Sequence, residues 1–180
     1  MRKVSGIIML VMVGCVAIPS GIEPVTGFEL ERYLGRWYEI ARLDHSFERG
    51  LTHVTADYRR QEDGRVQVVN RGYRPAEDRW EEAEGVAVPV GAPDVGRLKV
   101  SFFGPFYGGY NIIPLDRMAS RHALVCGPSR SYLWILARDP ILAPAVLDDL
   151  VARARVLGFA TEELIMVEHK PADPASGGDQ

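Results

Sequence analysis

Arg97-Leu98-Lys99-Val100-Ser101-Phe102-Phe103 is the stretch of sequence that decides the fold. Apolar and polar residues alternate along it, so Leu98, Val100 and Phe102 share one face and polar residues share the other. Strict alternation of this kind is typical of a half-buried β-strand. In a chain of 180 residues, such a strand predicts a single β-rich domain whose apolar face turns toward a core.

Seven further stretches are similarly rich in β-branched and aromatic residues, and turn residues separate them. The predicted strands cover residues 37–43, 52–60, 65–74, 79–88, 97–103, 107–115, 121–126 and 131–138. Short links such as Glu62-Asp63-Gly64 join antiparallel neighbours. Eight antiparallel strands lose their exposed edges by closing on themselves, so we expect an all-β fold, an eight-stranded antiparallel up-and-down β-barrel.

One stretch has a helical period. Apolar residues recur at three- and four-residue steps over residues 142–157, and Gly158 follows as a stop signal. We expect this single C-terminal α-helix to pack on the outside of the barrel. Residues 171–180 offer nothing to bury, so we expect a disordered tail after a domain that spans residues 28–170.

The first residues have the pattern of an export signal. Arg2 and Lys3 precede an apolar run from Val4 to Ile18, which is shorter than the roughly 20 residues of a membrane span. Met12-Val13-Gly14-Cys15 resembles a bacterial lipobox, in which the cysteine receives lipid. The resemblance implies a lipoprotein signal peptide over residues 1–14, cleaved before Cys15.

Lipidation of Cys15 would leave a lipid-anchored tether over residues 15–27, where proline and glycine are frequent. Cys126 is the one other cysteine, and it would then have no partner within the chain. A Cys15–Cys126 disulfide is the alternative, and it would require part of the apolar leader to be retained. We expect the lipidated form.

The parity of the side chains predicts which residues face the inside of the barrel. Along residues 79–88 we expect Ala83, Gly85 and Ala87 inside, because the opposite face would bury glutamates. An eight-stranded barrel holds either filling side chains or one small ligand. The expected walls of a lipid-binding pocket are Val54, Ala56, Tyr58, Val68, Asn70, Ala83, Leu98, Val100, Phe102, Tyr110, Ile112 and Trp134. A structural protein with a filled barrel stays open as an alternative, since Trp134, Tyr110 and Tyr132 could fill this space.

Gly35-Arg36-Trp37-Tyr38 matches the Gly-x-Trp-Tyr signature of lipocalins. Later segments are similar to bacterial lipocalins of the outer-membrane lipoprotein Blc family, and the resemblance covers residues 28–168. These segments are Phe47–Leu51, Lys99–Asn111, His122–Gly127 and Tyr132–Arg138. The resemblance implies a lipocalin (calycin) barrel in which Arg138 stacks over Trp37 and closes one end, a structural role.

The same resemblance implies a ligand and a location. The ligand would be a fatty acid or a phospholipid-derived lipid, bound for storage or transport of membrane lipids. The protein would lie at the bacterial outer membrane, facing the periplasm and held by the lipid on Cys15. The loop over residues 44–53 would frame the open end, where Phe47 and Leu51 either contact the ligand or pin the loop.

The segment Phe102–Tyr107 is more apolar than a solvated turn. It suits a corner of the core, a homodimer contact or a membrane-facing patch, and we expect the corner of the core. His45 and His53 share the loop at the mouth, where a pH-sensitive lid is conceivable, but we expect ordinary surface histidines.

Other classes of function find little support. The formal net charge is −3 and the basic residues are scattered, which argues against nucleic acid as a partner. The four histidines lack metal-ligand spacing and no cofactor motif occurs, so we expect neither a metal nor a cofactor. An enzyme acting on a lipid or a pigment through Cys126 is the remaining alternative. No cation adjoins that cysteine in the sequence, so we expect a binding protein and not an enzyme.

Overall fold

The computed structural model of the protein describes residues 16–113 and 121–169. The signal peptide expected over residues 1–14, Cys15 as the site of lipidation and the tail over residues 171–180 lie outside these residues. They stay predictions.

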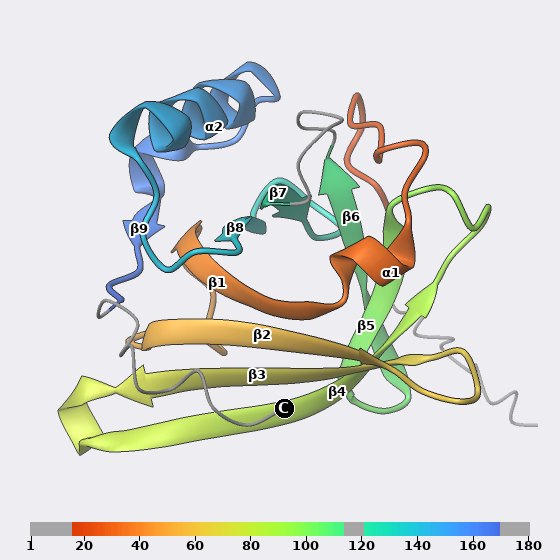
Figure 1. The fold of residues 1–180 in the computed structure, drawn as a ribbon. Coiled ribbons are helices and arrows are strands. Elements are labelled where there is room, and N and C mark those ends of the chain that lie inside the picture. The colour runs from red at the N-terminus through yellow and green to blue at the C-terminus, as the bar shows by residue number, and fades with distance from the viewer. Residues whose placement is uncertain (1–15, 114–120, 170–180) are drawn as a thin grey trace, which may run out of the picture.

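The eight predicted strands are all present, with ends that differ from the predicted ones by a few residues at most. They are β1 (Gly35–Arg42), β2 (Thr52–Arg60), β3 (Val66–Arg74), β4 (Arg79–Pro89), β5 (Arg97–Phe103), β6 (Phe106–Ile113), β7 (His122–Cys126) and β8 (Leu133–Ala137). Each strand pairs antiparallel with the next, and β8 pairs with β1 (Figure 1). The expected all-β fold, a closed up-and-down barrel, is confirmed.

The remaining elements flank the eight-stranded barrel. They are α1 (Leu30–Tyr33), α2 (Pro144–Val156), the 3-10 turns η1 (Pro75–Glu77) and η2 (Thr161–Glu163), and the short strand β9 (Ile165–Met166), which pairs with β1. The helix predicted over residues 142–157 is α2, and it begins at Pro144 as that residue type allows. Gly158 follows it with φ +82°, a conformation that glycine adopts without strain.

The inward faces of the strands form one apolar core. Cross-strand partners continue around the barrel, as in Val100 opposite Ala87 and Leu98 opposite Tyr110. The buried members of this inner core are Tyr33, Trp37, Tyr58, Val66, Val68, Ala87, Leu98, Ile112, Ala123, Val125 and Leu136. The alternation that predicted Leu98 inside therefore holds along most of the barrel wall, and register shifts interrupt it in β1, β2 and β5.

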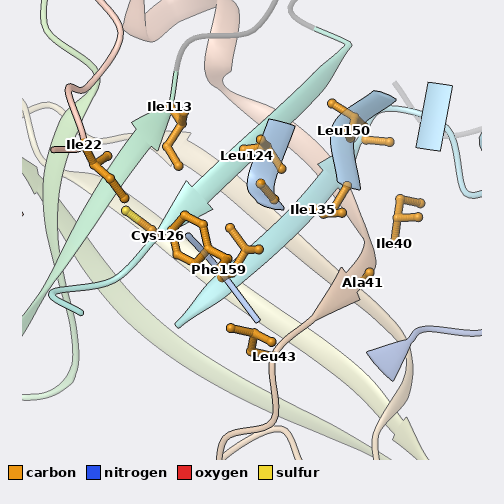
Figure 2. Close-up of a cluster of buried hydrophobic side chains, with 13 residues drawn as sticks. Ile22, Ile40, Ala41, Leu43, Ile113, Leu124, Cys126, Ile135, Leu150 and Phe159 are labelled. Carbon is orange, nitrogen blue, oxygen red and sulfur yellow. The ribbon is translucent and has the colours of Figure 1, made fainter. Parts of the chain in front are cut away.

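A second core lies between the outer wall and α2. Leu150 and Ala154 of the helix pack against outward-facing residues of β1, β7 and β8, and Phe159 completes the cluster (Figure 2). Cys126 belongs to this outer core. The C-terminal helix therefore covers the outside of the barrel, as predicted, and leaves the interior to the strands.

The expected tether does not hang free where the structure describes it. Ile22 is buried in the outer core, and the backbone N–H of Val25 donates to Ile112 O at 2.8 Å. Thr26 bridges to Val95, and the Phe28 N–H donates to Asp94 O. Residues 16–28 thus run along the wall and across one end of the barrel.

The two ends of the barrel differ. Because successive strands alternate in direction, the loops after β1, β3, β5 and β7 meet at one end, which we call the open end. At the opposite, closed end lie α1 and the chain that leads into it (Figure 1). Any ligand that enters the barrel along its axis would pass the open end.

Candidate functional site

The closed end is sealed by Trp37 and Arg138. The guanidinium carbon of Arg138 lies 3.9 Å from the centroid of the indole ring. Arg138 also donates to the carbonyl oxygens of Arg32, Leu34 and Arg36 at 2.7 to 2.8 Å. The structure thus places this pair in the arrangement that the family resemblance implies, and the arginine ties the wall to α1.

Three phenol groups form the floor of the interior above this seal. The hydroxyl of Tyr110 lies 2.6 Å from that of Tyr33 and 2.8 Å from that of Tyr58. Burial raises the pKa of all three phenols, so they stay neutral and satisfy one another. Tyr58 and Tyr110, expected as pocket walls, therefore lie at the bottom of the interior.

Small side chains face the interior above the floor. Ala83 and Gly85 of β4 and Gly108 of β6 are on the inward face. The ring of Phe102 occupies the space at Gly85, whereas open space remains at Gly108, opposite Val100. Inward residues near the floor, such as Val68 and Leu98, are buried, whereas Val100, Ala83 and Gly108 are partly or fully accessible to solvent. The interior is therefore filled at the closed end and reached by solvent from the open end.

The predicted pocket residues come together at this interior. Nine of the twelve belong to the inner core, namely Ala56, Tyr58, Val68, Leu98, Val100, Phe102, Tyr110, Ile112 and Trp134. Val54 packs beside Leu51 over Gly72, and Asn70 lies between Ala56 and Ala83 in the sheet. The structure places all of them on the inward side, while their contact with a ligand stays a prediction.

A buried charged network lies near the open end, and sequence reasoning missed it. Arg42 Nη1 donates to Glu39 Oε1 at 2.7 Å, and Arg42 Nη2 donates to Glu48 O at 2.8 Å. Glu48 Oε2 accepts from the Trp134 indole at 3.1 Å and lies 3.0 Å from His45 Nε2. All four charged or titratable side chains are buried. The network fastens the loop between β1 and β2 to the inside of the barrel.

A bulge in β1 explains why Arg42 faces inward. The register with β8 shifts between Glu39 and Ala41, so Ala41 faces the outer core and Arg42 the interior. Simple alternation from Trp37 would have placed Ala41 inside. The expectation that His45 is a surface histidine is wrong, because Glu48, Phe47 and Trp134 surround its buried ring.

The two carboxyl groups of this network differ in their electrostatics. Burial and the neighbouring Glu48 carboxylate raise the pKa of Glu39 well above its ordinary value, despite the bond from Arg42. Burial alone would raise the pKa of Glu48 as well, but the contacts from His45 and Trp134 and the charge of Arg42 lower it. Burial thus opposes ionisation of Glu39, whereas the partners of Glu48 favour its ionised form.

Phe47 and Leu51 have separate places in the mouth loop. The ring of Phe47 stacks on His45 with centroids 4.0 Å apart, and the side chain is largely exposed. Leu51 packs inward over Gly72, and its carbonyl oxygen accepts from Arg42 at 3.3 Å. Both residues therefore help to hold the loop, and Phe47 also presents apolar surface at the mouth.

Cys126 is poorly placed for nucleophilic chemistry. It is fully buried in the outer core, next to Ile22 and Phe159 (Figure 2). Burial raises the pKa of its thiol to about 11, so little thiolate forms near neutral pH. Its side chain points away from the interior, toward the outside of the barrel wall, so it cannot touch a ligand in the barrel.

The segment Phe102–Tyr107 divides between core and surface. Phe102 packs inward, with its ring against Gly85, but Phe103 and Phe106 are 80% and 58% exposed. The expected corner of the core is therefore wrong for these two rings. The turn extends past the end of the β4–β5 pairing, so no strand covers them.

Neither a metal centre nor a spanning helix emerges from the described residues. Residues 16–113 and 121–169 contain no cluster of three or more His, Cys, Asp or Glu side chains that could hold a metal. Within the same residues, no helix is long and apolar enough to cross a membrane.

Comparisons with known proteins agree with this architecture. The model of the lipocalin-like domain matches residues 28–169. The chain is 50% identical to the outer membrane lipoprotein Blc of Vibrio cholerae over 157 residues, which cover 87% of this chain and 92% of that protein. It is 53% identical to the outer membrane lipoprotein Blc of Escherichia coli over 150 residues, or 83% of this chain and 84% of that protein.

A solved structure shows the same fold at low sequence identity. Insecticyanin from the tobacco hornworm Manduca sexta superposes with a TM-score of 0.67 and 20% identity, over 87% of this chain and 88% of that one. The family match covers most of the chain, and it includes the barrel, α2 and β9. The chain therefore belongs to the lipocalin-like family.

Proposed function

We propose that this protein binds a fatty acid or a lysophospholipid inside the barrel and stores or carries it at the bacterial outer membrane. The observation that carries the proposal is the graded interior, which has a floor of tyrosines, small apolar walls above it and a buried charged network at the mouth. An elongated ligand with an apolar chain and a polar head fits that gradient. The relatives named outer membrane lipoprotein Blc support the location.

The location follows from a lipid anchor on Cys15 after cleavage of residues 1–14, with the barrel facing the periplasm. The names of the relatives support a lipoprotein, and Met12-Val13-Gly14-Cys15 supplies the site of attachment. A homodimer is compatible with an anchored barrel.

A binding function is favoured over an enzymatic one. Cys126, the candidate nucleophile, faces the outer core and not the interior. The upper interior has small inward side chains and is reached by solvent. Both features favour a bound ligand over a barrel filled by its own side chains. A substitution that fills this space should therefore abolish binding without affecting the fold.

The test compares two valine-to-tryptophan variants in native mass spectrometry, titrated with a fatty acid, a lysophospholipid and a diacyl phospholipid. Val100→Trp places an indole in the interior, whereas Val69→Trp, on the outward face of β3, is the matched control. We expect a one-to-one lipid adduct in the unaltered protein and in the control, and its loss in Val100→Trp. If Val100→Trp binds lipid as well as the control does, the ligand lies elsewhere and the proposal is wrong.

A further inference from the structure

The turn between β5 and β6 presents two large apolar rings to solvent at the open end. Phe103 and Phe106 are cross-strand partners, so their side chains lie on the same face of the hairpin. Their exposure, 80% and 58%, is far greater than phenylalanine usually shows. Two neighbouring rings of this kind mark a contact surface more often than a single exposed residue does.

The outer wall next to this turn is aromatic and cationic. Lys99 Nζ lies 4.7 Å from the centroid of the Tyr107 ring. Neither Lys99 nor Arg97 takes part in an ion pair among residues 16–113 and 121–169. Tyrosine and lysine side chains of this kind suit the headgroup region of a membrane, where an apolar stem and a polar tip are both satisfied.

The described chain begins on the same wall. Arg97 Nη2 donates to Val16 O at 2.9 Å, and Asn111 Nδ2 donates to Ala17 O at 3.3 Å. Gly109 allows this close approach, since a Cβ there would lie 2.9 Å from Ala17 O. Gly109 and Phe106 are three residues apart on β6, a distance of about 10 Å along the strand.

Chain connectivity then limits where an anchor can be. Cys15 directly precedes Val16 in the sequence, and Val16 is the first described residue on this wall. A lipid attached at that position would hold the wall formed by β5 and β6 close to the membrane surface. The two exposed rings lie on the part of the molecule that such an anchor brings to the bilayer.

We propose that Phe103, Phe106, Tyr107 and Lys99, which we call the β5–β6 surface, dock on a phospholipid bilayer. This inference rests on the proposed lipidation of Cys15 and deepens the proposed function, because it names the partner from which the barrel takes its lipid. The two phenylalanines enter the apolar edge of the bilayer, Tyr107 lies among the headgroups and Lys99 meets lipid phosphates. The open end of the barrel then faces the lipid source.

The test measures the depth of two labelled positions in the intact lipoprotein. Mass spectrometry first establishes the acyl chains on Cys15, and the protein is reconstituted in vesicles of phosphatidylethanolamine with some phosphatidylglycerol. An environment-sensitive fluorophore is attached to Phe103→Cys or to Val156→Cys, since Cys126 is buried and does not compete for the label. Val156 is the matched control, because it is 88% exposed and ends α2, far from the β5–β6 turn (Figure 1).

We expect a blue shift of the label at position 103, and loss of its emission when the vesicles contain spin-labelled lipid, with no change at position 156. Equal, water-like emission at both positions would overturn the proposal, and so would a Cys15 that carries no acyl chain. A blue shift at position 103 that grows with protein concentration and needs no vesicles would assign the surface to a second copy of the chain instead.

A double variant adds a functional readout. Phe103→Ser together with Phe106→Ser should slow lipid uptake from vesicles roughly tenfold, because apolar contact with the bilayer is lost. Its affinity for a lysophospholipid in free solution should not change. Unchanged uptake from vesicles would contradict the docking role. A protein that binds no lipid, yet has position 103 in the bilayer, would refute the proposed function and support the surface.

Discussion

At the scale of single residues, the most informative feature is a buried arginine that bonds to one carboxyl group and to the backbone of a loop. Arg42 bonds to Glu39 and to the carbonyl oxygen of Glu48, so it joins the barrel wall to the mouth loop. Burying charges is costly, and removal of one partner leaves the others without compensation. The network is thus a structural requirement of the mouth as well as its polar lining.

Substitution of Arg42 should therefore be severe. Arg42→Met is expected to lower the free energy of unfolding by about 3–5 kcal/mol, as measured by urea denaturation. Arg36→Met is the matched control on the same strand, because the guanidinium of Arg36 is 54% exposed in its pair with Asp57 and should contribute about 0–1 kcal/mol.

A second variant separates charge from packing. Arg42→Met combined with Glu39→Gln should be more stable than Arg42→Met alone, since the double variant does not bury an unpaired carboxyl group. If Arg42→Met costs no more than Arg36→Met, the interior network is not a buried ion pair and this part of the account fails.

At the scale of elements, the packing of inward side chains from β4, β5 and β6 determines where the interior has space. On the inward face, Gly85 receives the ring of Phe102, whereas Gly108 of β6 has no atom near the place of a Cβ. These two glycines face the same interior and differ in whether space remains beside them. The pair therefore tests the packing of the upper barrel directly.

Gly85→Ala should destabilise the protein and Gly108→Ala should be tolerated. The added Cβ at position 85 would lie 2.6 Å from Ser101 O and 2.7 Å from the Phe102 ring, so strand and ring must both move. We expect a loss of about 1–3 kcal/mol in the free energy of unfolding. Similar melting curves for the two variants would show that Phe102 does not pack on Gly85.

The elements were largely predictable because their signals are local. Alternation placed Leu98, Val100 and Phe102 inside, and the apolar stripe before Gly158 predicted α2. Alternation could not reveal the bulge in β1, since two of its residues oppose one on β8, and the sequence does not mark this. It therefore missed that Arg42 faces inward.

Other features of the site depend on contacts between distant segments. Contacts with Arg42 and Trp134 hold Glu48 and the neighbouring His45 in buried positions. The composition of a polar loop does not predict that its charged side chains are buried. The one signal in the sequence was the pair of opposite charges, Glu39 and Arg42, on either side of Ile40 and Ala41. The exposure of Phe103 and Phe106 depends on how far β4 continues beside β5, which sequence does not show.

At the scale of the whole molecule, the protein separates two apolar cores by one sheet. The outer core holds α2 and Cys126 on the wall, and the inner core leaves small residues and solvent access near the open end. Structure and stability therefore depend on both cores, whereas the proposed ligand binding depends on the upper interior. A lipid in this protein should contact β4, β5 and β6 and leave α2 untouched.

The measurement that tests this claim most directly is photo-crosslinking with a fatty acid that carries a diazirine in its chain, followed by mapping of the modified peptides. The account predicts modification within residues 79–89, 97–103 and 106–113, at inward-facing positions such as Ala83 and Val100, and its suppression by excess unlabelled fatty acid. Modification confined to α2 or to other outward-facing residues would contradict a ligand inside the barrel.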